Sequence, residues 1–236
     1  MKKIAILQSN YIPWKGYFDL INTVDDFVLL DEVQYTKQDW RNRNRIKTKN
    51  GLLWLTIPIR QESFKQRICE TKISDWRWRI KHWKAIKQNY AKTKYFASYK
   101  DKIELLYTGS TQEFLSEVNF RFIKGINEIL GIQTKLHYSI DFKLLEDQNK
   151  RLINICKELG ANIYLSGPAA KGYLNEKLFE SEGVSVCWMD YSGYPEYDQL
   201  FPPFEHSVTI LDLLFNTGSE AYKYMKSFGF NSSENP

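Results

Sequence analysis

The sequence is poor in the residues that form metal centres and disulfide frameworks. Its 236 residues include only three cysteines, which are widely spaced and form no CxxC pair. The three histidines, His82, His137 and His206, are also far apart, and no HxH or HExxH spacing occurs. Structural zinc sites and disulfide-rich folds need closely grouped cysteines or histidines. We therefore expect neither a resident metal ion nor a disulfide framework.

Long apolar runs are missing as well. A bilayer-spanning helix needs about 20 largely apolar residues in succession, and no segment of the chain approaches that length. Residues 1–7 begin with basic side chains and an apolar run, but Gln8, Ser9 and Asn10 interrupt it before a signal-peptide core can form. We therefore expect a cytoplasmic protein without a membrane span.

Neither sign of charge dominates the chain. It has 33 lysines and arginines against 28 aspartates and glutamates, a net charge of +5. This mild excess suits a phosphate-bearing ligand, but it also suits an ordinary soluble protein, and it is smaller than expected for a dedicated nucleic-acid binder. Aromatic residues are abundant instead, with seven Trp and fifteen Tyr. We expect some of them to lie half-exposed at a ligand surface.

The order of strand and helix signals predicts an α/β fold. Apolar runs at 3–7 and 27–30 flank a helical pattern that starts at Gly16, which is typical of a βαβ unit. Between about 74 and 131 the apolar residues recur every three or four positions, which indicates two or three helices. Further strands are expected at 52–59, 134–140, 161–165 and 184–188, and further helices at 148–159, 175–183 and from 209. We expect one domain over 1–236, with a mostly parallel, Rossmann-like sheet and a helical insertion at about 74–131.

Polar side chains follow four of the predicted strands. In parallel sheets the carboxyl ends of the strands share one edge, where ligands bind. Turns favour polar residues in any case, so one polar turn carries little weight, whereas four predict a shared pocket. The residues in question are Gln8 and Asn10, Asp31 and Gln34, Ser166 and Gly167, and Asp190 and Tyr191.

The first turn and the segment after the second strand contain the most distinctive patterns. In the first turn, Pro13 is expected to keep Ile12 in an extended conformation. In the second segment, three arginines alternate with asparagines in a predicted loop over 39–45. Alternate residues of an extended segment share a face, and the planar guanidinium suits phosphate. We expect Arg41 and Arg43, with Asn42, to bind a diphosphate such as that of a nucleotide-sugar, and a solvated charged loop is the alternative.

A third segment, residues 166–171, lies between a predicted strand and a predicted helix. Such a turn can present backbone N–H groups and the ammonium of Lys171 to an anion. The spacing GxxxxGK[ST] of a phosphate-binding P-loop is absent. This segment is therefore a candidate wall of the site rather than a nucleoside-triphosphate loop.

Several blocks of sequence resemble the WbqC-like protein family. They follow one another from the first predicted strand to the last predicted helix, and they read QSNYIPWKGYFDLI, LLDEVQYTKQDWRNRNRIKT, WLTIPI, YLSGPAAKGYL and GYPEYDQLFPPFEHSVTILDLLFN. The resemblance implies a function in the biosynthesis of bacterial O-antigen (lipopolysaccharide) or another surface polysaccharide. It also implies glycine or aminoacyl transfer onto a sugar as the activity.

A more distant similarity concerns the first strand, turn and helix. Residues 10–17 are similar to the corresponding part of the nucleotidyltransferase and pantothenate-synthetase superfamily, in which a HxGH-like motif binds the phosphates of ATP. Trp14 and Tyr17 stand at the positions of the two histidines. The similarity supports a Rossmann-like fold and leaves the cofactor open, with ATP as one candidate.

Three functions remain open from the sequence. The first is a transferase that forms an amide or ester on a nucleotide-linked amino sugar. The second is a non-catalytic module that binds a glycan precursor or nucleotide-sugar. The third, nucleic-acid binding through the arginine-rich segment and exposed aromatics, is disfavoured because only that one segment is markedly basic.

The transferase hypothesis assigns roles to individual residues. Acyl transfer needs a base that frees the attacking amine and donors for the developing oxyanion. Three residues are candidates for the base: Asp31, His82 and Asp190. Three are expected to orient the substrate: Gln8, Asn10 and Gln34. Three are expected to stack on it: Tyr11, Trp14 and Trp40.

Overall fold

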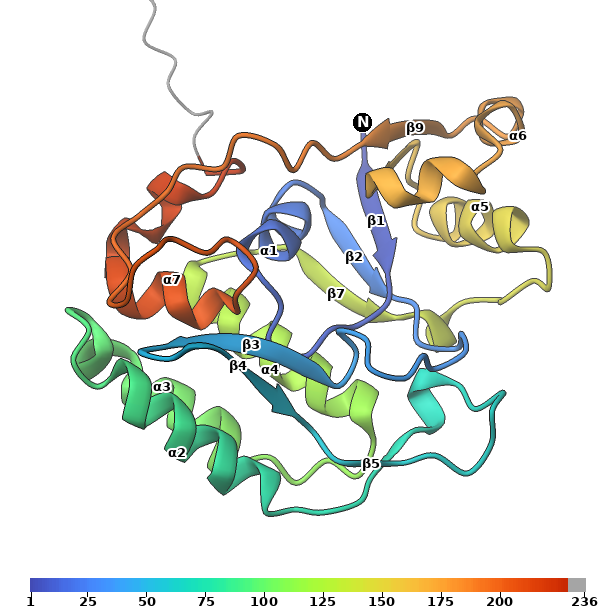
Figure 1. The fold of residues 1–236 in the computed structure, drawn as a ribbon. Helices are drawn as coiled ribbons and strands as arrows, with labels where there is room; N and C mark the ends of the chain where they lie inside the picture. The colour runs from blue at the N-terminus through green and yellow to red at the C-terminus, as the bar shows by residue number, and fades with distance from the viewer. Residues whose placement is uncertain (229–236) are drawn as a thin grey trace, which may run out of the picture.

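Five parallel strands form the central sheet of the computed structural model, which describes residues 1–228 (Figure 1). The strands lie in the order β7-β2-β1-β8-β9. Their bounds are β1 Lys3–Leu7, β2 Asp26–Leu29, β7 Lys135–Tyr138, β8 Ile163–Ser166 and β9 Ser185–Trp188. The predicted α/β class, with a parallel Rossmann-like sheet, is confirmed.

Helices cover both faces of this sheet, which explains why its strands are almost continuously apolar. Along β1, Ile4 and Ile6 pack in a cluster with side chains of α5 (Gln148–Glu158) and α6 (Glu176–Ser181). Ala5 points the other way, into the larger core that contains side chains of α1 (Lys15–Asn22). Successive strand residues thus bury opposite faces.

The direction of the chain across the sheet reverses between β1 and β8. From β1 the chain proceeds through β2 to β7 on one side, and it then returns to β8 and β9 on the other side. In open α/β sheets a crevice forms at this reversal, outside the carboxyl ends of the strands. The carboxyl end of β1 therefore faces the place where a ligand is most expected.

The arginine-rich segment is a strand from Arg43 onward rather than a loop. β3 (Arg43–Thr48) pairs antiparallel with β4 (Gly51–Thr56) in a separate hairpin that lies across one end of the main sheet (Figure 1). Alternating arginine and asparagine carries no apolar strand signal, so the expectation of a loop was wrong for residues 43–45. The strand predicted at 52–59 ends at Thr56, and β5 (Ile59–Arg60) pairs instead with β6 (Lys72–Ile73).

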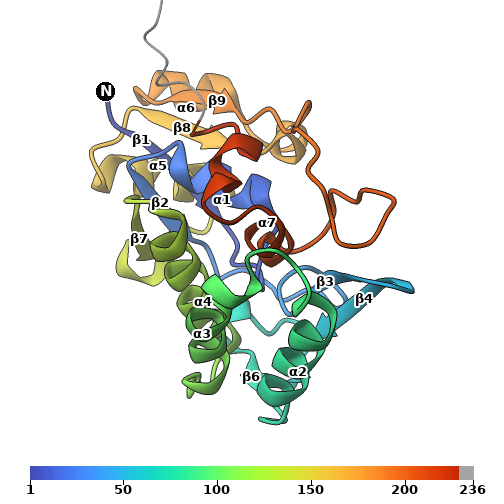
Figure 2. The ribbon, with the colours of Figure 1, turned by 90° about the vertical axis from the view of Figure 1, so that its left-hand side faces the viewer.

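The block between β6 and β7 consists of α2 (Trp78–Tyr90), α3 (Phe96–Thr108) and α4 (Leu115–Leu130), which lie together on one side of the molecule (Figure 2). Trp78, Tyr107 and Phe122 form its aromatic interior. The remaining helix is α7 (Ile210–Thr217), and short 3-10 helices occur at Ile68–Glu70, Ser139–Asp141, Pro168–Gly172 and Gly218–Tyr224. Within residues 1–228 no helix is long and apolar enough to cross a membrane.

Candidate functional site

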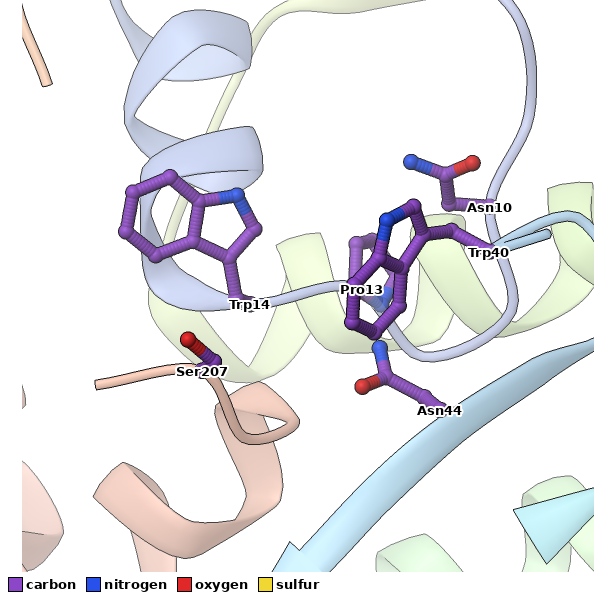
Figure 3. A pocket seen from close by; sticks show the side chains of 6 residues that line it. All are labelled: Asn10, Pro13, Trp14, Trp40, Asn44 and Ser207. Carbon is purple, nitrogen blue, oxygen red and sulfur yellow. The ribbon is translucent and has the colours of Figure 1, made fainter. Parts of the chain in front are cut away.

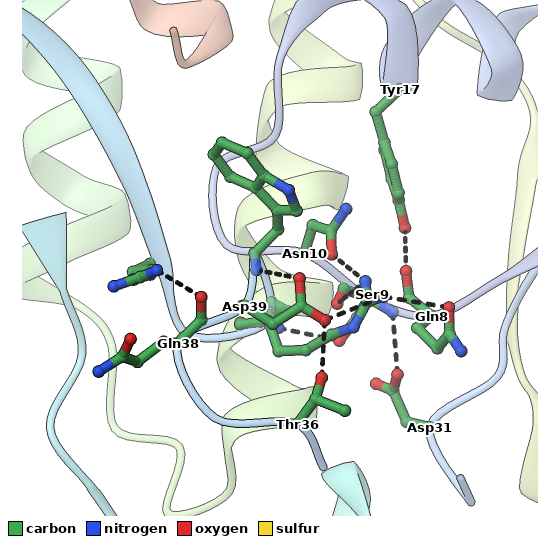
Figure 4. Close-up of polar contacts among 12 residues, drawn as sticks. Gln8, Ser9, Asn10, Tyr17, Asp31, Thr36, Gln38 and Asp39 are labelled. Atoms are coloured by element: carbon green, nitrogen blue, oxygen red, sulfur yellow. Dashed lines mark hydrogen bonds and ion pairs between the residues drawn. The ribbon is translucent and has the colours of Figure 1, made fainter. Parts of the chain in front are cut away.

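The guanidinium of Arg41 lies beside the turn that follows β1. Its Nη2 donates to Oε1 of Gln8 at 3.2 Å, and its Nη1 donates to Oδ1 of Asn10 (Figure 4). The carboxylate of Asp39 lies 3.7 Å from Nη2, and the Arg41 side chain keeps 15% of its surface exposed. Amide oxygens are neutral acceptors, so they position the guanidinium without neutralising it, while the Asp39 carboxylate offsets part of its charge. Arg41 is thus a preorganised cation at the carboxyl end of the sheet.

Two hollows adjoin the residues that hold Arg41. The first, which we call the tryptophan pocket, has a volume of about 220 Å³, and it is lined by Asn10, Pro13, Trp14, Trp40, Asn44 and Ser207 (Figure 3). The second, which we call the glutamine pocket, has a volume of about 410 Å³, and its polar lining consists of Gln8, Gln34, Gln148, Arg151, Tyr164 and Tyr173. Arg41 is hydrogen-bonded to Asn10 of the first pocket and to Gln8 of the second. It therefore links the two.

Two indoles form opposite sides of the tryptophan pocket, with Ser207 and Asn44 below them in Figure 3. Trp14 precedes α1 and lies against Gly16, where a Cβ would come within 2.3 Å of the indole. Only glycine fits at that position. Trp40 is 40% exposed and presents an aromatic face. Such faces stack on the apolar side of sugar rings and on planar groups.

The turn that carries Asn10 and Trp14 is strained. Ile12 has a φ of 36°, in the left-handed region that a β-branched residue rarely adopts, so the expectation of an extended Ile12 was wrong. The amide of Asn44 explains this conformation, because its Nδ2 donates to the carbonyl oxygens of Tyr11 (3.1 Å) and Ile12 (2.8 Å). Strained residues persist where the surrounding contacts over-determine them, and they concentrate at binding sites.

Asp31 lies just beyond β2 and has only 1% of its surface exposed. Its Oδ1 accepts a hydrogen bond from the backbone N–H of Ser9 at 2.9 Å (Figure 4), and its Oδ2 has no hydrogen-bond partner among residues 1–228. Burial raises the pKa of Asp31 to about 6, although the hydrogen bonds from Ser9 and the charge of Arg41 oppose this shift. The carboxyl group can therefore exchange a proton near neutral pH, as a general base must.

Comparisons with known proteins found a matching family and a relative. A family model described as the WbqC-like protein family matches residues 8–224, which begin at Gln8 and include every residue that lines the tryptophan pocket. The chain belongs to the WbqC-like protein family. The predicted resemblance is confirmed, and membership suggests a biosynthetic role in polysaccharide pathways.

One relative of this WbqC-like protein is an uncharacterized protein of Mycobacterium tuberculosis. It is 47% identical over 227 residues, which is 96% of this chain and 98% of that protein. No solved structure matches the chain significantly.

Tyr11 and His82 lie together in the core of the WbqC-like protein rather than in either pocket. Tyr11 has no exposed surface, and its hydroxyl lies 2.9 Å from Nδ1 of His82 and 2.9 Å from the hydroxyl of Tyr107. Burial lowers the pKa of His82 to about 4, so its imidazole is neutral at physiological pH. These contacts leave no face of Tyr11 open to a ligand, and they place His82 away from both pockets.

Asp190 points into solvent beyond β9, and its side chain is 68% exposed. Lys226 donates to its Oδ2 at 2.8 Å, and the hydroxyl of Ser192 donates to its Oδ1 at 2.7 Å. These contacts hold the pKa of the Asp190 carboxyl well below its usual range. A carboxylate with so low a pKa is a weak base, and Asp190 lines neither pocket.

The ends of β8 and β9 reach the outer side of Trp14. The ring of Tyr191 lies 5.5 Å from the indole of Trp14, and a Cβ on Gly167 would lie 3.7 Å from the Tyr191 hydroxyl. Ser166 is buried, and the ammonium of Lys171 lies 5.4 Å above an indole of β9. Gly167, Tyr191 and Trp14 are therefore brought together, whereas Lys171 is directed elsewhere.

Of the other predicted residues, some pack against neighbouring elements and one lines a pocket. Asn42 is buried, and its Nδ2 donates to the carbonyl oxygen of Ile57 at 2.8 Å, which ties the hairpin together. The guanidinium of Arg43 lies 4.2 Å above the ring of Trp54, which in turn packs 5.4 Å from Trp40. Gln34 lines the glutamine pocket. Arg43 thus supports the outer side of a tryptophan wall, while Arg41 alone of the two bonds to Gln8 and Asn10.

Sequence reasoning missed several residues that complete the pockets. Gln148 and Arg151 could have been found, because a helix that precedes a parallel strand begins at the carboxyl edge of the sheet. Asn44 and Ser207 come from a strand and a loop that are distant in sequence, and no local signal marks them. The same holds for Asn119 of α4, whose Nδ2 donates to Oγ of Ser9 (2.9 Å) and to the carbonyl oxygen of Arg41 (2.9 Å).

Metal chemistry finds no support in the side-chain arrangement. Among residues 1–228 no group of three or more histidine, cysteine, aspartate or glutamate side chains is placed to hold an ion. The site consists instead of a fixed cation, amide groups, indoles and one buried carboxyl. Such a set can bind an anion that is joined to a ring and can accept a proton.

Proposed function

We propose that this WbqC-like protein is a cytoplasmic transferase of surface-polysaccharide biosynthesis. In this proposal it binds a nucleotide-linked amino sugar and joins an aminoacyl or glycyl group to the amine of the sugar. One observation carries the proposal: Arg41 is held at the carboxyl end of β1, between a pocket with aromatic walls and a pocket with amide walls.

The chemistry of Arg41 matches a diphosphate. A guanidinium donates two parallel hydrogen bonds to phosphate oxygens, and it stays charged at every physiological pH. Trp14 and Trp40 provide faces on which a sugar ring can stack beside that diphosphate. A nucleotide-sugar has this order of groups, with the diphosphate in the middle.

The transfer step requires one proton acceptor. The amine nitrogen attacks the carbonyl carbon of an activated acyl group, such as an acyl adenylate or thioester, so that a C–N bond forms and the leaving group departs with its bonding electrons. The amine must lose a proton as this happens. None of the three candidate bases lines either pocket. We assign this proton to Asp31, because its Oδ1 is bonded to Ser9 in the turn beside Arg41, its pKa is raised to about 6 and its Oδ2 has no partner among the described residues.

A binding module is the second candidate, and one observation favours it. Among residues 1–228, no Asp, Glu, His, Cys or Lys side chain lines either pocket, and Asp31 lies beneath the surface. A protein that only carries or senses a glycan precursor needs no titrating group in contact with its ligand. Turnover therefore has to be measured directly.

Mass spectrometry separates the two candidates. The protein is incubated with a nucleotide-linked amino sugar, glycine and ATP, and then with a preformed glycyl thioester in place of glycine and ATP. We expect a product heavier than the amino sugar by one glycyl group, and we expect Asp31→Asn to lose at least 100-fold of that rate while it still binds the nucleotide-sugar. Binding without product for the unaltered protein would establish the binding module instead.

A further inference from the structure

The two pockets differ in volume and therefore suit groups of different size. Pockets for ligands of drug size usually have volumes of about 300 to 1,000 Å³. The glutamine pocket, at about 410 Å³, falls in this range, and the tryptophan pocket, at about 220 Å³, is below it. The smaller pocket has room for a single ring or a small substituent. A nucleotide-sugar must therefore extend beyond it.

The larger pocket has the chemistry that recognises a neutral heterocycle. Three of its polar side chains are the amides of Gln8, Gln34 and Gln148, and an amide carries two N–H donors and an oxygen acceptor. Gln8 uses its oxygen to accept from Arg41 and Gln34 uses one N–H on the carbonyl oxygen of Phe64, so both keep an N–H donor for a ligand. Nucleobase edges present the same two kinds of group side by side. The half-exposed ring of Tyr173 adds an aromatic face, and bases stack on such faces.

The position of the larger pocket also fits a nucleoside. Its lining comes from the carboxyl end of β1, the segment after β2, Tyr164 of β8 and the first turns of α5. The strand order reverses between β1 and β8, and a crevice is expected there. Gln8 belongs to this lining and also accepts a hydrogen bond from Arg41. A group bound there is therefore next to the cation that the diphosphate would occupy.

We infer that the glutamine pocket binds the nucleoside of a nucleotide-sugar, that Arg41 binds the diphosphate, and that the tryptophan pocket binds the sugar. This inference rests on the proposed function, and it adds the orientation of the substrate. The reacting amine of the sugar then lies on the Trp40 side of Arg41, and the nucleobase of the substrate lies on the Gln148 side.

Two kinds of truncated ligand test this orientation. Isothermal titration calorimetry is performed with nucleoside monophosphates (UMP, CMP, AMP and GMP) and with glucosamine 1-phosphate. Tyr173→Ala and Gln148→Leu alter exposed side chains of the glutamine pocket, and Trp40→Ala alters the tryptophan pocket. Tyr222→Ala is the matched control for Tyr173, because Tyr222 is similarly exposed, 45% against 51%, and lies outside both linings.

We expect Tyr173→Ala and Gln148→Leu to weaken binding of the preferred nucleoside monophosphate about tenfold and to leave glucosamine 1-phosphate unaffected. Trp40→Ala should weaken binding of glucosamine 1-phosphate and leave the nucleoside monophosphate unaffected. Tyr222→Ala should change the affinity for neither ligand. Suppose that the unaltered protein binds an intact nucleotide-sugar, and that Tyr173→Ala and Gln148→Leu bind UMP, CMP, AMP and GMP as tightly as the unaltered protein does. The orientation is then wrong, and the proposed function stands. If the unaltered protein binds no nucleotide-sugar at all, both fall.

Discussion

Arg41 and Arg43 are two residues apart, yet their surroundings give them different properties. Arg41 is oriented by amide oxygens of the first turn, whereas Arg43 lies flat on Trp54 and donates to the carbonyl oxygen of Gln38. Sequence alone predicted both as phosphate ligands, because a pattern of alternate arginines shows which residues share a face and not what that face meets. The orientation depends on Gln8 and Asn10, which lie more than thirty positions earlier in the chain.

Asp31 was also predictable as a candidate, because it directly follows an apolar strand. Its raised pKa was not, since burial is a property of the assembled core. Tyr11 shows the opposite case: it lies in the polar first turn, but its ring enters the aromatic interior of the helical block and reaches His82 and Tyr107. An aromatic residue in a turn can face either way, and only packing decides.

The titration of Asp31 predicts a pH dependence of stability. Its pKa is about 6 in the folded protein and near 3.9 in an unfolded chain. The folded state thus binds this proton more tightly, so the contribution is fully present below about pH 4 and is lost as the pH rises through 6. The free energy of unfolding relative to Asp31→Asn should fall by about 2 kcal/mol between about pH 4 and pH 7.

Urea denaturation of the two proteins across this pH range measures that difference. Asp101→Asn, an exposed position on α3, serves as the control and should show no comparable trend. A constant difference between the unaltered protein and Asp31→Asn at all pH values would show that Asp31 is ionised as readily in the folded chain as in the unfolded one.

At the scale of elements, the first turn depends on the hairpin that lies against it. Asn44 of β3 donates to two consecutive carbonyl oxygens of this turn, and the backbone N–H of Tyr11 donates to the carbonyl oxygen of Trp40 at 3.0 Å. These bonds hold Ile12 at its positive φ. The sequence predicted the strand and the helix on either side, but it predicted an extended Ile12, because local rules do not include contacts from another element.

Removal of the Asn44 side chain should therefore affect both stability and the pocket. Asn44→Ala leaves two buried carbonyl oxygens without their donor and should lower the free energy of unfolding by about 2 to 3 kcal/mol. Asn50→Ala, at the exposed turn of the same hairpin, should change it by less than about 0.5 kcal/mol. Chemical denaturation measures both, and equal small effects would show that the turn holds its own conformation.

The segment between β9 and α7 is a second case in which long-range contacts decide the structure. Lys15 of α1 is 4% exposed, and its ammonium donates to the carbonyl oxygen of Pro195 at 2.8 Å. The buried carboxylate of Asp212 accepts hydrogen bonds from the Tyr197 hydroxyl and the Gln199 amide, both at 2.8 Å. These bonds fix the segment that brings Ser207 to the tryptophan pocket, and the sequence shows only a loop rich in Pro, Gly and aromatics.

At the scale of the whole molecule, the sequence predicts the sheet well. β1 begins and ends where its apolar run does, and the other four strands of the sheet lie within a few residues of their predicted bounds. Apolar runs determine these strands because both faces of each are buried. The hairpin and the division of the site into two pockets were not predictable, since the strand β3 has a polar sequence and the pocket walls come from five separate parts of the chain.

The two pockets, with Arg41 between them, form the centre of the account. The most direct test is the affinity of a UDP-linked amino sugar for Arg41→Ala, measured by isothermal titration calorimetry. Arg77→Ala is the matched control, because its side chain is 76% exposed and pairs with Asp75 outside both pockets. Loss of one or two charge-assisted hydrogen bonds should weaken binding at least tenfold for Arg41→Ala and not for Arg77→Ala. Equal affinities for both variants and the unaltered protein would contradict the account.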